Sequence, residues 1–185
     1  MKKLTLYFLL LFFSMNSISQ NGRNGPSLWE EIRMNSKLDY DNTKPQIIEA
    51  LKKYDSHQYL INRLSKNGQR YLFYTVQEAL KKDLPVELSL IPFVESQFDP
   101  YAQSSTGASG IWQFIPSTAR ENGLKKNWWY DGRRDILAST EAAYTFLTSL
   151  YEKYDDWLIA IAAYNAGPSR IRREIEKNKS NGLPT

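Results

Sequence analysis

The sequence is short of the residues that most enzymes use for metal binding and nucleophilic catalysis. Its 185 residues include no cysteine and a single histidine, His57. The absence of cysteine excludes disulfides, thiolate nucleophiles, thiolate metal sites and the acylated cysteine of a bacterial lipoprotein. A single histidine strongly disfavours both a histidine-dependent catalytic triad and a multi-histidine metal site. We therefore expect no metal and no other cofactor, and any acid–base chemistry should fall to carboxylates.

The sequence also lacks a strong charge of either sign. It contains 24 Lys and Arg against 20 Asp and Glu, a formal net charge of +4. Lys2 and Lys3 belong to an N-terminal segment without acids, so the remaining balance is 22 against 20. This balance gives no reason to expect a nucleic-acid partner. Because 42% of the residues are apolar and no segment has low complexity, the chain should form one globular unit with a real core.

Residues 1–19 have the pattern of a secretory signal peptide. Two lysines precede the apolar run from Leu4 to Phe13, and small residues follow at Ser17 and Ser19. The run is too short to span a bilayer comfortably. We expect it to be cleaved and the rest of the chain to be exported across the inner membrane, to the periplasm or cell envelope. The alternative is an uncleaved anchor, and only then would the chain be associated with the membrane.

Hydrophobic periodicity predicts an all-α fold, since no segment alternates with period two. Ser27 and Glu30 have the spacing of a capping box and predict a helix start, and Pro45 suits the first turn of another helix. Further helices are expected around Tyr71–Lys81, from near Arg134 to just before Asp155, over Trp157–Ala163 and over Ile171–Ile175. The long helix should bury a stripe formed by Leu137, Thr140, Tyr144, Leu147, Tyr151 and Tyr154. Trp157–Ala163 is apolar nearly all round, so we expect it to be buried.

Glycine and proline mark the expected breaks between these helices. Gly167 should close the Trp157 helix in a left-handed conformation, and Pro168 should open the next helix. A short irregular hairpin is expected near Gly107–Gly110.

The segment Pro85–Ser96 is predicted to be an apolar helix that carries Glu95 at its far end. Leu88, Ile91 and Glu95 are spaced to share one face, and no Lys or Arg lies within four residues of Glu95. A carboxyl group on a core-facing stripe loses hydration, which favours its neutral form as a proton donor. On spacing alone, a solvated and idle glutamate at a helix end is the more common situation.

A polar side chain set among aromatic rings follows this helix. Gly107 and Gly110 allow the backbone to bend closely, and Gln113 lies between Trp112 and Phe114. An amide that donates and accepts suits sugar hydroxyl and acetamido groups, while aromatic rings suit the apolar faces of sugars. The alternative is an ordinary glycine turn whose two aromatic rings pack into the core.

The apolar helix Trp157–Ala163 leads directly into a phenol and an amide, Tyr164 and Asn165. Polar side chains at the end of an apolar helix need hydrogen-bond partners. Those partners are either neighbouring backbone groups or a ligand.

Three segments in this order resemble the three motifs of the lytic transglycosylases, the family that cleaves bacterial peptidoglycan. They are Glu95-Ser96, Gly110-Ile111-Trp112-Gln113 and Ala163-Tyr164-Asn165-Ala166-Gly167. A wider pattern resembles the membrane-bound murein transglycosylases of the D type over roughly residues 27–184. That pattern comprises Leu28–Glu30, Asp83–Leu88, Trp128–Asp135 and Ala138–Thr140.

The resemblance implies a role for each matching residue. Glu95 would be the sole catalytic acid and base, and Ser104 would hydrogen-bond near its carboxyl group and the substrate. Gln113, Tyr164 and Asn165 would line the sugar site, whose partner is a peptidoglycan glycan strand. We assign Ser96 to fixing the helix end.

The implied fold is a goose-type lysozyme-like helical domain over residues 85–185, with residues 20–84 as a helical extension packed on it. The family pattern usually continues past Gly182-Leu183-Pro184 into a Trp-containing stretch and a Glu-Thr segment. We therefore expect this domain to be truncated at its C-terminal end and the chain to be a fragment of a longer product. An extended version should be thermally more stable.

Ordinary glycosidases use two carboxylates, and the nearest second one, Asp99, precedes Pro100, where an Asp usually forms a turn. The resemblance implies that one carboxylate suffices: Glu95 protonates the glycosidic oxygen, and the muramyl C6 hydroxyl then attacks C1 to give a 1,6-anhydro sugar. The rivals are a hydrolytic muramidase on the same scaffold, a non-catalytic peptidoglycan-binding module and a structural envelope protein.

Overall fold

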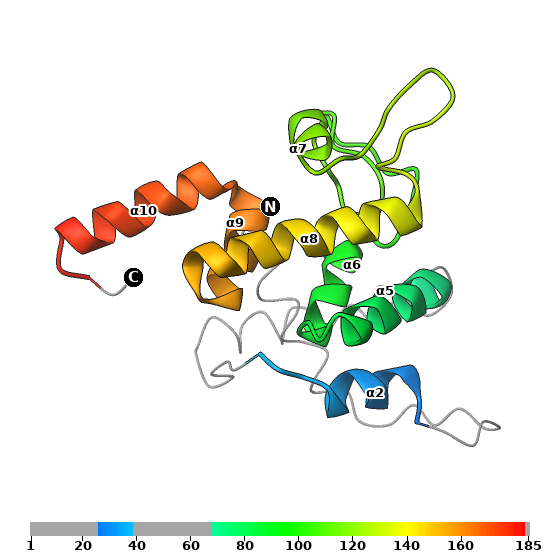
Figure 1. The fold of residues 1–185 in the computed structure, drawn as a ribbon, viewed down its shortest axis with the longest axis horizontal. Coiled ribbons are helices and arrows are strands. Elements are labelled where there is room, and N and C mark those ends of the chain that lie inside the picture. The colour runs from blue at the N-terminus through cyan, green and yellow to red at the C-terminus, as the bar shows by residue number, and fades with distance from the viewer. Residues whose placement is uncertain (1–25, 39–67, 184–185) are drawn as a thin grey trace, which may run out of the picture.

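The computed structural model describes residues 26–38 and 68–183 (Figure 1). The predicted signal peptide, the helix expected at Pro45 and His57 lie outside these ranges. The described elements are α2 (Leu28–Met34), α5 (Gln69–Lys81), η3 (Val86–Leu90), α6 (Ile91–Ser96), α7 (Pro116–Glu121), α8 (Ile136–Tyr154), α9 (Trp157–Ala166) and α10 (Pro168–Ser180). Pairing between extended segments in the described part is limited to isolated bridges. The all-α prediction is therefore confirmed.

Helix α8 runs through the middle of the fold, and the other elements are arranged around it (Figure 1). Helix α9 turns back against α8, and α10 contacts α9 and then projects away from the body. On one side of α8, α5 packs against η3. Helix α7 and a projecting loop between α7 and α8 lie on the other side. None of the helices within residues 26–38 and 68–183 combines the length and hydropathy needed to cross a bilayer.

Local sequence signals set most of the helix ends. The Ser27 hydroxyl accepts from the Glu30 amide, and the Glu30 carboxylate accepts from the Ser27 amide, so the predicted capping box is confirmed. Helix α8 begins just after Asp135, whose carboxylate accepts from the Ala138 amide, and it ends at the residue before Asp155. Pro168 opens α10 as predicted, but α10 continues past Ile175 to Ser180.

Two expectations about burial were wrong. Thr140, Tyr144 and Leu147 are buried as the stripe predicts, but Leu137 in the first turn of α8 is 61% exposed, because the stripe meets the core only from the next turn on. In α9 the buried residues are Ala160, Ile161 and Ala163, while the rest of the helix is half-buried. Packing against α8 and α10 covers only part of its circumference.

Gly167 has φ 91° and ψ 134°, so its positive φ is confirmed, although its ψ is extended and the residue is not a left-handed helical cap. The hairpin expected near Gly107–Gly110 is present as two isolated antiparallel bridges, which join Ser109 to Gln103 and to Phe114.

The predicted single helix over Pro85–Ser96 was wrong in detail. The chain forms the 3₁₀ helix η3 first and then the α-helix α6. Pro92 lies in the first turn of α6, where it suits a helix start but lacks the N–H that would continue a longer helix from η3. The boundary that we predicted between residues 84 and 85 stays a prediction, and one buried core cluster includes both Leu72 of α5 and Leu88 of η3.

A second carboxylate, Glu87, precedes Glu95 in the sequence and is hydrogen-bonded to the segment that follows α2. Glu87 in η3 is buried, and one of its oxygens accepts from the Ser36 hydroxyl and from the amides of Lys37 and Leu38. These contacts attach the segment after α2 to the core, so Glu87 has a structural role.

The loops between α6 and α8 are held together by a buried arginine. Arg133 forms a bidentate pair with Asp131, with Nε–Oδ1 2.9 Å and Nη2–Oδ2 2.6 Å. Its Nη1 also donates to the carbonyls of Gly107 (2.7 Å) and Phe114 (3.3 Å). One side chain therefore connects the loop before α8 to the Gly107–Phe114 hairpin.

Because of the Arg133–Asp131 pair, we expect part of the free energy of unfolding to be lost at acid pH. Hydrogen bonds from Arg133 hold the pKa of Asp131 below its ordinary value, against the opposing effect of burial. A lowered pKa stabilises the fold above the unfolded-state pKa, and the contribution is lost as the pH falls through the folded-state pKa. Asp131→Asn should therefore cost about 2 kcal/mol at pH 7, and the difference from the native chain should shrink below about pH 4. Urea unfolding at several pH values measures this, and a difference independent of pH would contradict it.

Candidate active site

Glu95 lies in the last turn of α6 and is half-buried. The chain leaves the helix through Gln97 and Phe98, both with positive φ (55° and 59°), a conformation that non-glycine residues adopt at some energetic cost. Phe98 is buried in the core cluster and secures this turn. The turn ends α6 immediately after Glu95, so the carboxyl group is placed where the helix stops.

Ser96 ties this helix end to the next motif. Its hydroxyl lies 3.0 Å from the Pro92 carbonyl and 2.9 Å from the Ile111 carbonyl. The first contact is within α6 and the second reaches the Gly110–Gln113 segment. Ser96 thus fixes the helix end, as we assigned from the sequence.

The aromatic residues beside Gln113 belong to the core. Trp112 and Phe114 are buried, so the expectation that they could stack on a sugar is replaced by its alternative. The Trp112 indole donates to the Thr140 hydroxyl of α8 at 3.0 Å. Sequence reasoning missed Thr140 as the partner of this indole, and no local pattern reveals a contact between residues so distant along the chain.

Gln113 itself is half-buried and has φ 50°. Its amide nitrogen donates to the carbonyls of Gly110 (2.8 Å) and Ala102 (3.2 Å). Within residues 26–38 and 68–183 no group donates to its amide oxygen, which leaves that oxygen able to accept from a ligand hydroxyl or amide.

Tyr164, in the last turns of α9, joins the third motif to the second. Its hydroxyl donates to the Trp112 carbonyl at 2.8 Å, and its ring packs edge-on against Trp112 and Phe114. Burial raises the pKa of Tyr164 well above its ordinary value, and the nearby negative charge of Glu95 raises it further. Tyr164 is therefore a neutral donor, close enough to Glu95 for the two side chains to interact electrostatically.

The two remaining predicted residues have local partners. Ser104 accepts from the Ala108 amide (3.0 Å) and pairs with the Thr106 hydroxyl (2.9 Å), so these bonds lie within its own turn rather than at Glu95. Asn165 donates to the Ile161 carbonyl one turn earlier in α9 at 2.9 Å. Hydrogen bonds thus connect Ser96 and Tyr164 to the backbone of the segment that carries Gln113, while the bonds of Ser104 and Asn165 lie within their own turns.

Asp99, the acidic residue that follows Glu95 in the sequence, was predicted to form a turn. Asp99 is exposed and accepts from the Tyr101 amide at 2.8 Å, which is the turn-forming role expected from the sequence. In the described ranges no three His, Asp or Glu residues are grouped so that they could hold a metal ion.

Replacing Tyr164 with Phe tests the link between the second and third motifs. The change removes the bond to the Trp112 carbonyl, and it should lower the free energy of unfolding by about 1 kcal/mol. Thermal denaturation measures the effect, and the matched control Tyr101→Phe, at an exposed tyrosine, should leave it unchanged. Equal stability of both variants would show that the Tyr164 hydroxyl does not hold the segment.

Comparison with known proteins places these motifs in a described family. Residues 74–183 match the family model described as the transglycosylase SLT domain. The chain is 41% identical over 141 residues to membrane-bound lytic murein transglycosylase D of Escherichia coli K12, which covers 76% of this chain and 31% of that protein. It is 44% identical over 122 residues to a putative tributyltin chloride resistance protein of Alteromonas sp. M-1, over 64% of this chain and 59% of that protein. The matched region thus spans only part of either relative.

Proposed function

Because the chain belongs to the transglycosylase SLT domain family, we propose that it is a lytic transglycosylase that cleaves the β-1,4 bond between N-acetylmuramic acid and N-acetylglucosamine in peptidoglycan. The observation that carries the proposal is that two hydrogen bonds join the three motif segments: the Ser96 hydroxyl, next to Glu95, donates to the Ile111 carbonyl, and the Tyr164 hydroxyl donates to the Trp112 carbonyl, beside Gln113. One of the relatives is named a lytic murein transglycosylase, which supports the same substrate class.

In this proposal Glu95 acts first as a general acid. Its proton goes to the glycosidic oxygen as the bond to C1 of the muramyl sugar breaks, and N-acetylglucosamine leaves. The acetamido oxygen of the muramyl sugar supports the positive charge at C1, in the manner of substrate-assisted glycosidases.

Glu95, now a carboxylate, then acts as the general base. It takes the proton from the muramyl C6 hydroxyl, whose oxygen attacks C1 and closes the 1,6-anhydro ring. Glu95 ends the cycle protonated, and no water is consumed. A single carboxyl group suffices because the sugar supplies the nucleophile, which agrees with the turn-forming role of Asp99.

The other site residues position the substrate. Gln113 offers its amide oxygen as an acceptor, and Tyr164 holds the Gln113 segment through the Trp112 carbonyl. Asn165 would contact the sugar with its amide oxygen, because its amide nitrogen is bonded to the Ile161 carbonyl. Ser104 would contact it with its hydroxyl, which also bonds within its own turn. We also propose residues 20–84 as a helical extension of the catalytic domain, and export to the periplasm or cell envelope as the route to the substrate.

Digestion of purified sacculi tests this function. The proposal predicts soluble muropeptides that end in 1,6-anhydro-N-acetylmuramic acid, which are lighter by one water than hydrolytic products. Mass spectrometry separates the two. Reducing-end products would establish the hydrolytic muramidase instead, and sacculi that bind the protein without any release would establish the non-catalytic binding module.

A further inference from the structure

The loop between α7 and α8 presents two neighbouring tryptophans to solvent. Trp128 and Trp129 are 87% and 89% exposed, although large aromatic side chains are usually well covered. Figure 1 shows this loop projecting from the body of the fold. The site around Glu95 uses neither residue, so their exposure needs a separate explanation.

The loop is well organised. The Asn127 side-chain oxygen accepts from the amides of Trp129 (2.9 Å) and Tyr130 (2.8 Å). The Asn127 amide donates to the Tyr130 carbonyl, and the Gly132 amide donates to the Lys125 carbonyl, both at 2.8 Å. These bonds close the loop at its tip and at its base. They fix the backbone that carries the two indoles, whose ring centroids are 6.2 Å apart with an angle of 84° between the planes.

A hollow of about 550 Å³ lies beside the tryptophans, lined by residues 126–131, 134 and 135. Its carboxylates are already engaged, since Asp131 pairs with Arg133 and Asp135 accepts from Tyr130 and from the start of α8. Arg134 donates one bond, from Nε to the Ser109 hydroxyl. No other group within the described ranges takes up its terminal nitrogens.

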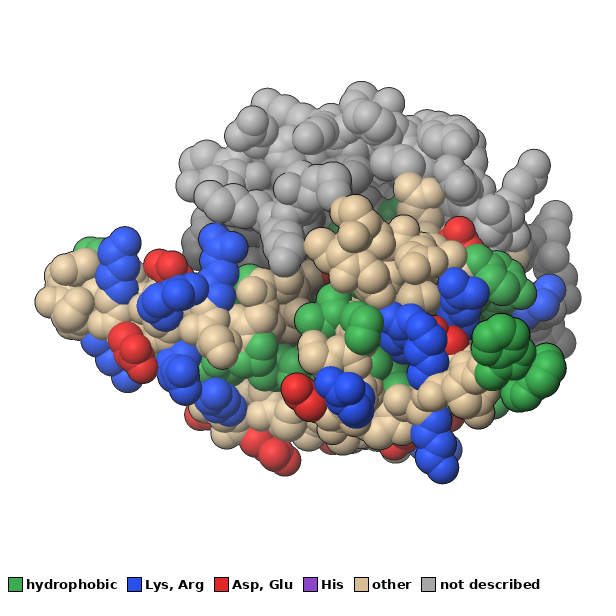
Figure 2. All heavy atoms as spheres, turned by 90° about the horizontal axis from the view of Figure 1, so that it is seen from above, with side chains coloured by type: hydrophobic (Ala, Val, Ile, Leu, Met, Phe, Trp, Pro, Cys, Tyr) green, Lys and Arg blue, Asp and Glu red, His purple; other side chains and the backbone are tan. Residues whose placement is uncertain are grey.

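The hollow is lined by two carboxylates, Asp131 and Asp135, and by two cations, Lys126 and Arg134. The Lys126 Nζ is 3.7 Å from Asp131 and largely exposed, so the terminal nitrogens of Arg134 are the cationic group that a ligand carboxylate can pair with. Figure 2 shows hydrophobic side chains gathered at one end of this face next to several Lys and Arg side chains. Aromatic faces beside an arginine suit a sugar strand whose attached peptides carry carboxylates.

We propose that this hollow, which we call the Trp128–Trp129 site, is a second binding site for peptidoglycan strands. An indole takes the apolar face of an N-acetylhexosamine ring, and the terminal nitrogens of Arg134 bind a carboxylate of the peptide attached to the strand. The site rests on the proposed function for its substrate class. It would hold the insoluble polymer while another part of the strand reacts at Glu95.

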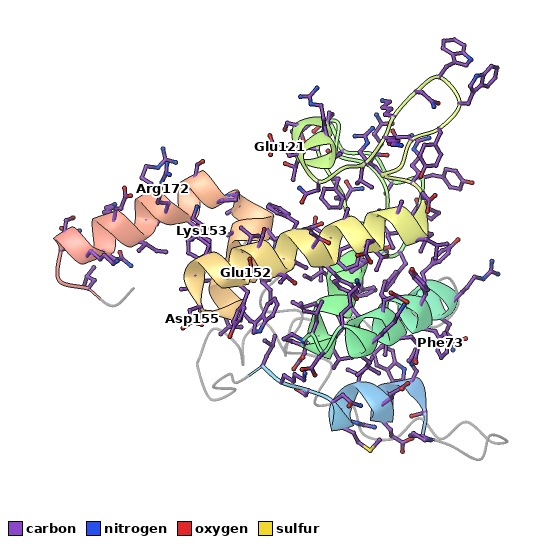
Figure 3. The ribbon with its side chains drawn as sticks, viewed as in Figure 1. Phe73, Glu121, Glu152, Lys153, Asp155 and Arg172 are labelled. Carbon is purple, nitrogen blue, oxygen red and sulfur yellow. The ribbon has the colours of Figure 1, made fainter. Side chains whose placement is uncertain are left out.

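A binding experiment without cleavage tests this site. In the Glu95→Gln background, Trp128→Ala/Trp129→Ala should raise the apparent Kd for purified sacculi in co-sedimentation by about tenfold or more. Phe73→Ala is the matched control, because Phe73 is also exposed and lies on α5, away from this loop (Figure 3). It should bind as the background does. Arg134→Gln should likewise raise the apparent Kd for intact sacculi.

The outcomes distinguish the two proposals. Unchanged sacculus binding by the double tryptophan variant would overturn the second site, whatever products the native chain forms. If the double tryptophan variant loses binding to phosphatidylglycerol vesicles but keeps its binding to sacculi, the second site is also overturned, and the loop is assigned to a membrane surface. If the native chain forms no anhydro products but the double tryptophan variant still loses sacculus binding tenfold, the proposed reaction is overturned and the second site stands. Circular dichroism and the melting temperature of the double variant should match those of the background.

Discussion

Glu95→Gln should slow the lysis of sacculi by at least about a thousandfold, because general acid–base catalysis typically contributes factors of 10² to 10⁴ and here one group performs both proton transfers. Glutamine keeps the shape of the side chain but neither donates an acidic proton nor accepts one as a carboxylate does. Turbidity loss of a sacculus suspension measures the rate.

Two further variants make this prediction specific. Glu95→Asp keeps the chemistry but shortens the side chain by one methylene, and a displacement of about 1 Å costs roughly a hundredfold in rate. Glu152→Gln removes an exposed carboxylate from α8 (Figure 3) and should lyse sacculi at the native rate. Substantial lysis by Glu95→Gln with its melting temperature unchanged would mean that another group provides the acid.

Gly110→Ala should lower the free energy of unfolding by roughly 4 kcal/mol or more, a large loss for a substitution that adds one methyl group. A Cβ at Gly110 would lie 1.7 Å from the Arg133 carbonyl oxygen, which is a collision between two backbone segments, and the residue has φ 82°. Relief would require the loop before α8 to move, and with it the Arg133 bonds to Gly107 and Phe114.

Gly107→Ala provides the matched control. Gly107 lies in the same hairpin with φ 80°, but the nearest atoms to its Cβ are those of Pro116 at 3.9 Å. Its replacement incurs only the cost of a positive φ, about 1 to 2 kcal/mol. Urea unfolding of both variants separates backbone conformation from collision. Equal losses would contradict the close packing of Gly110 against Arg133.

The sequence predicted those features that depend on neighbouring residues. The capping box at Ser27, the ends of α8 and the start of α10 at Pro168 each follow from one or two side chains acting on adjacent backbone groups. The order of the three motifs around Glu95, Gln113 and Tyr164 was sufficient to suggest the family, since the relevant residue types occur at fixed places along the chain.

Features that depend on contacts between distant segments could not be predicted from periodicity. Helix η3 packs against α5, a contact that the periodicity of Pro85–Ser96 does not reveal. Trp112 is a core residue because Thr140 of α8 accepts from its indole. The sequence alone does not distinguish Arg133 from the arginines of the surface, and only the fold places it against the Gly107 and Phe114 carbonyls.

The most direct test of the account is sacculus digestion in water enriched in ¹⁸O, followed by mass analysis of the glycan ends. A reaction in which Glu95 transfers protons and the muramyl C6 oxygen attacks C1 predicts anhydro ends without label from the native chain and no new ends from Glu95→Gln. Incorporation of ¹⁸O at C1 would contradict the account, since the attacking oxygen would then have come from water.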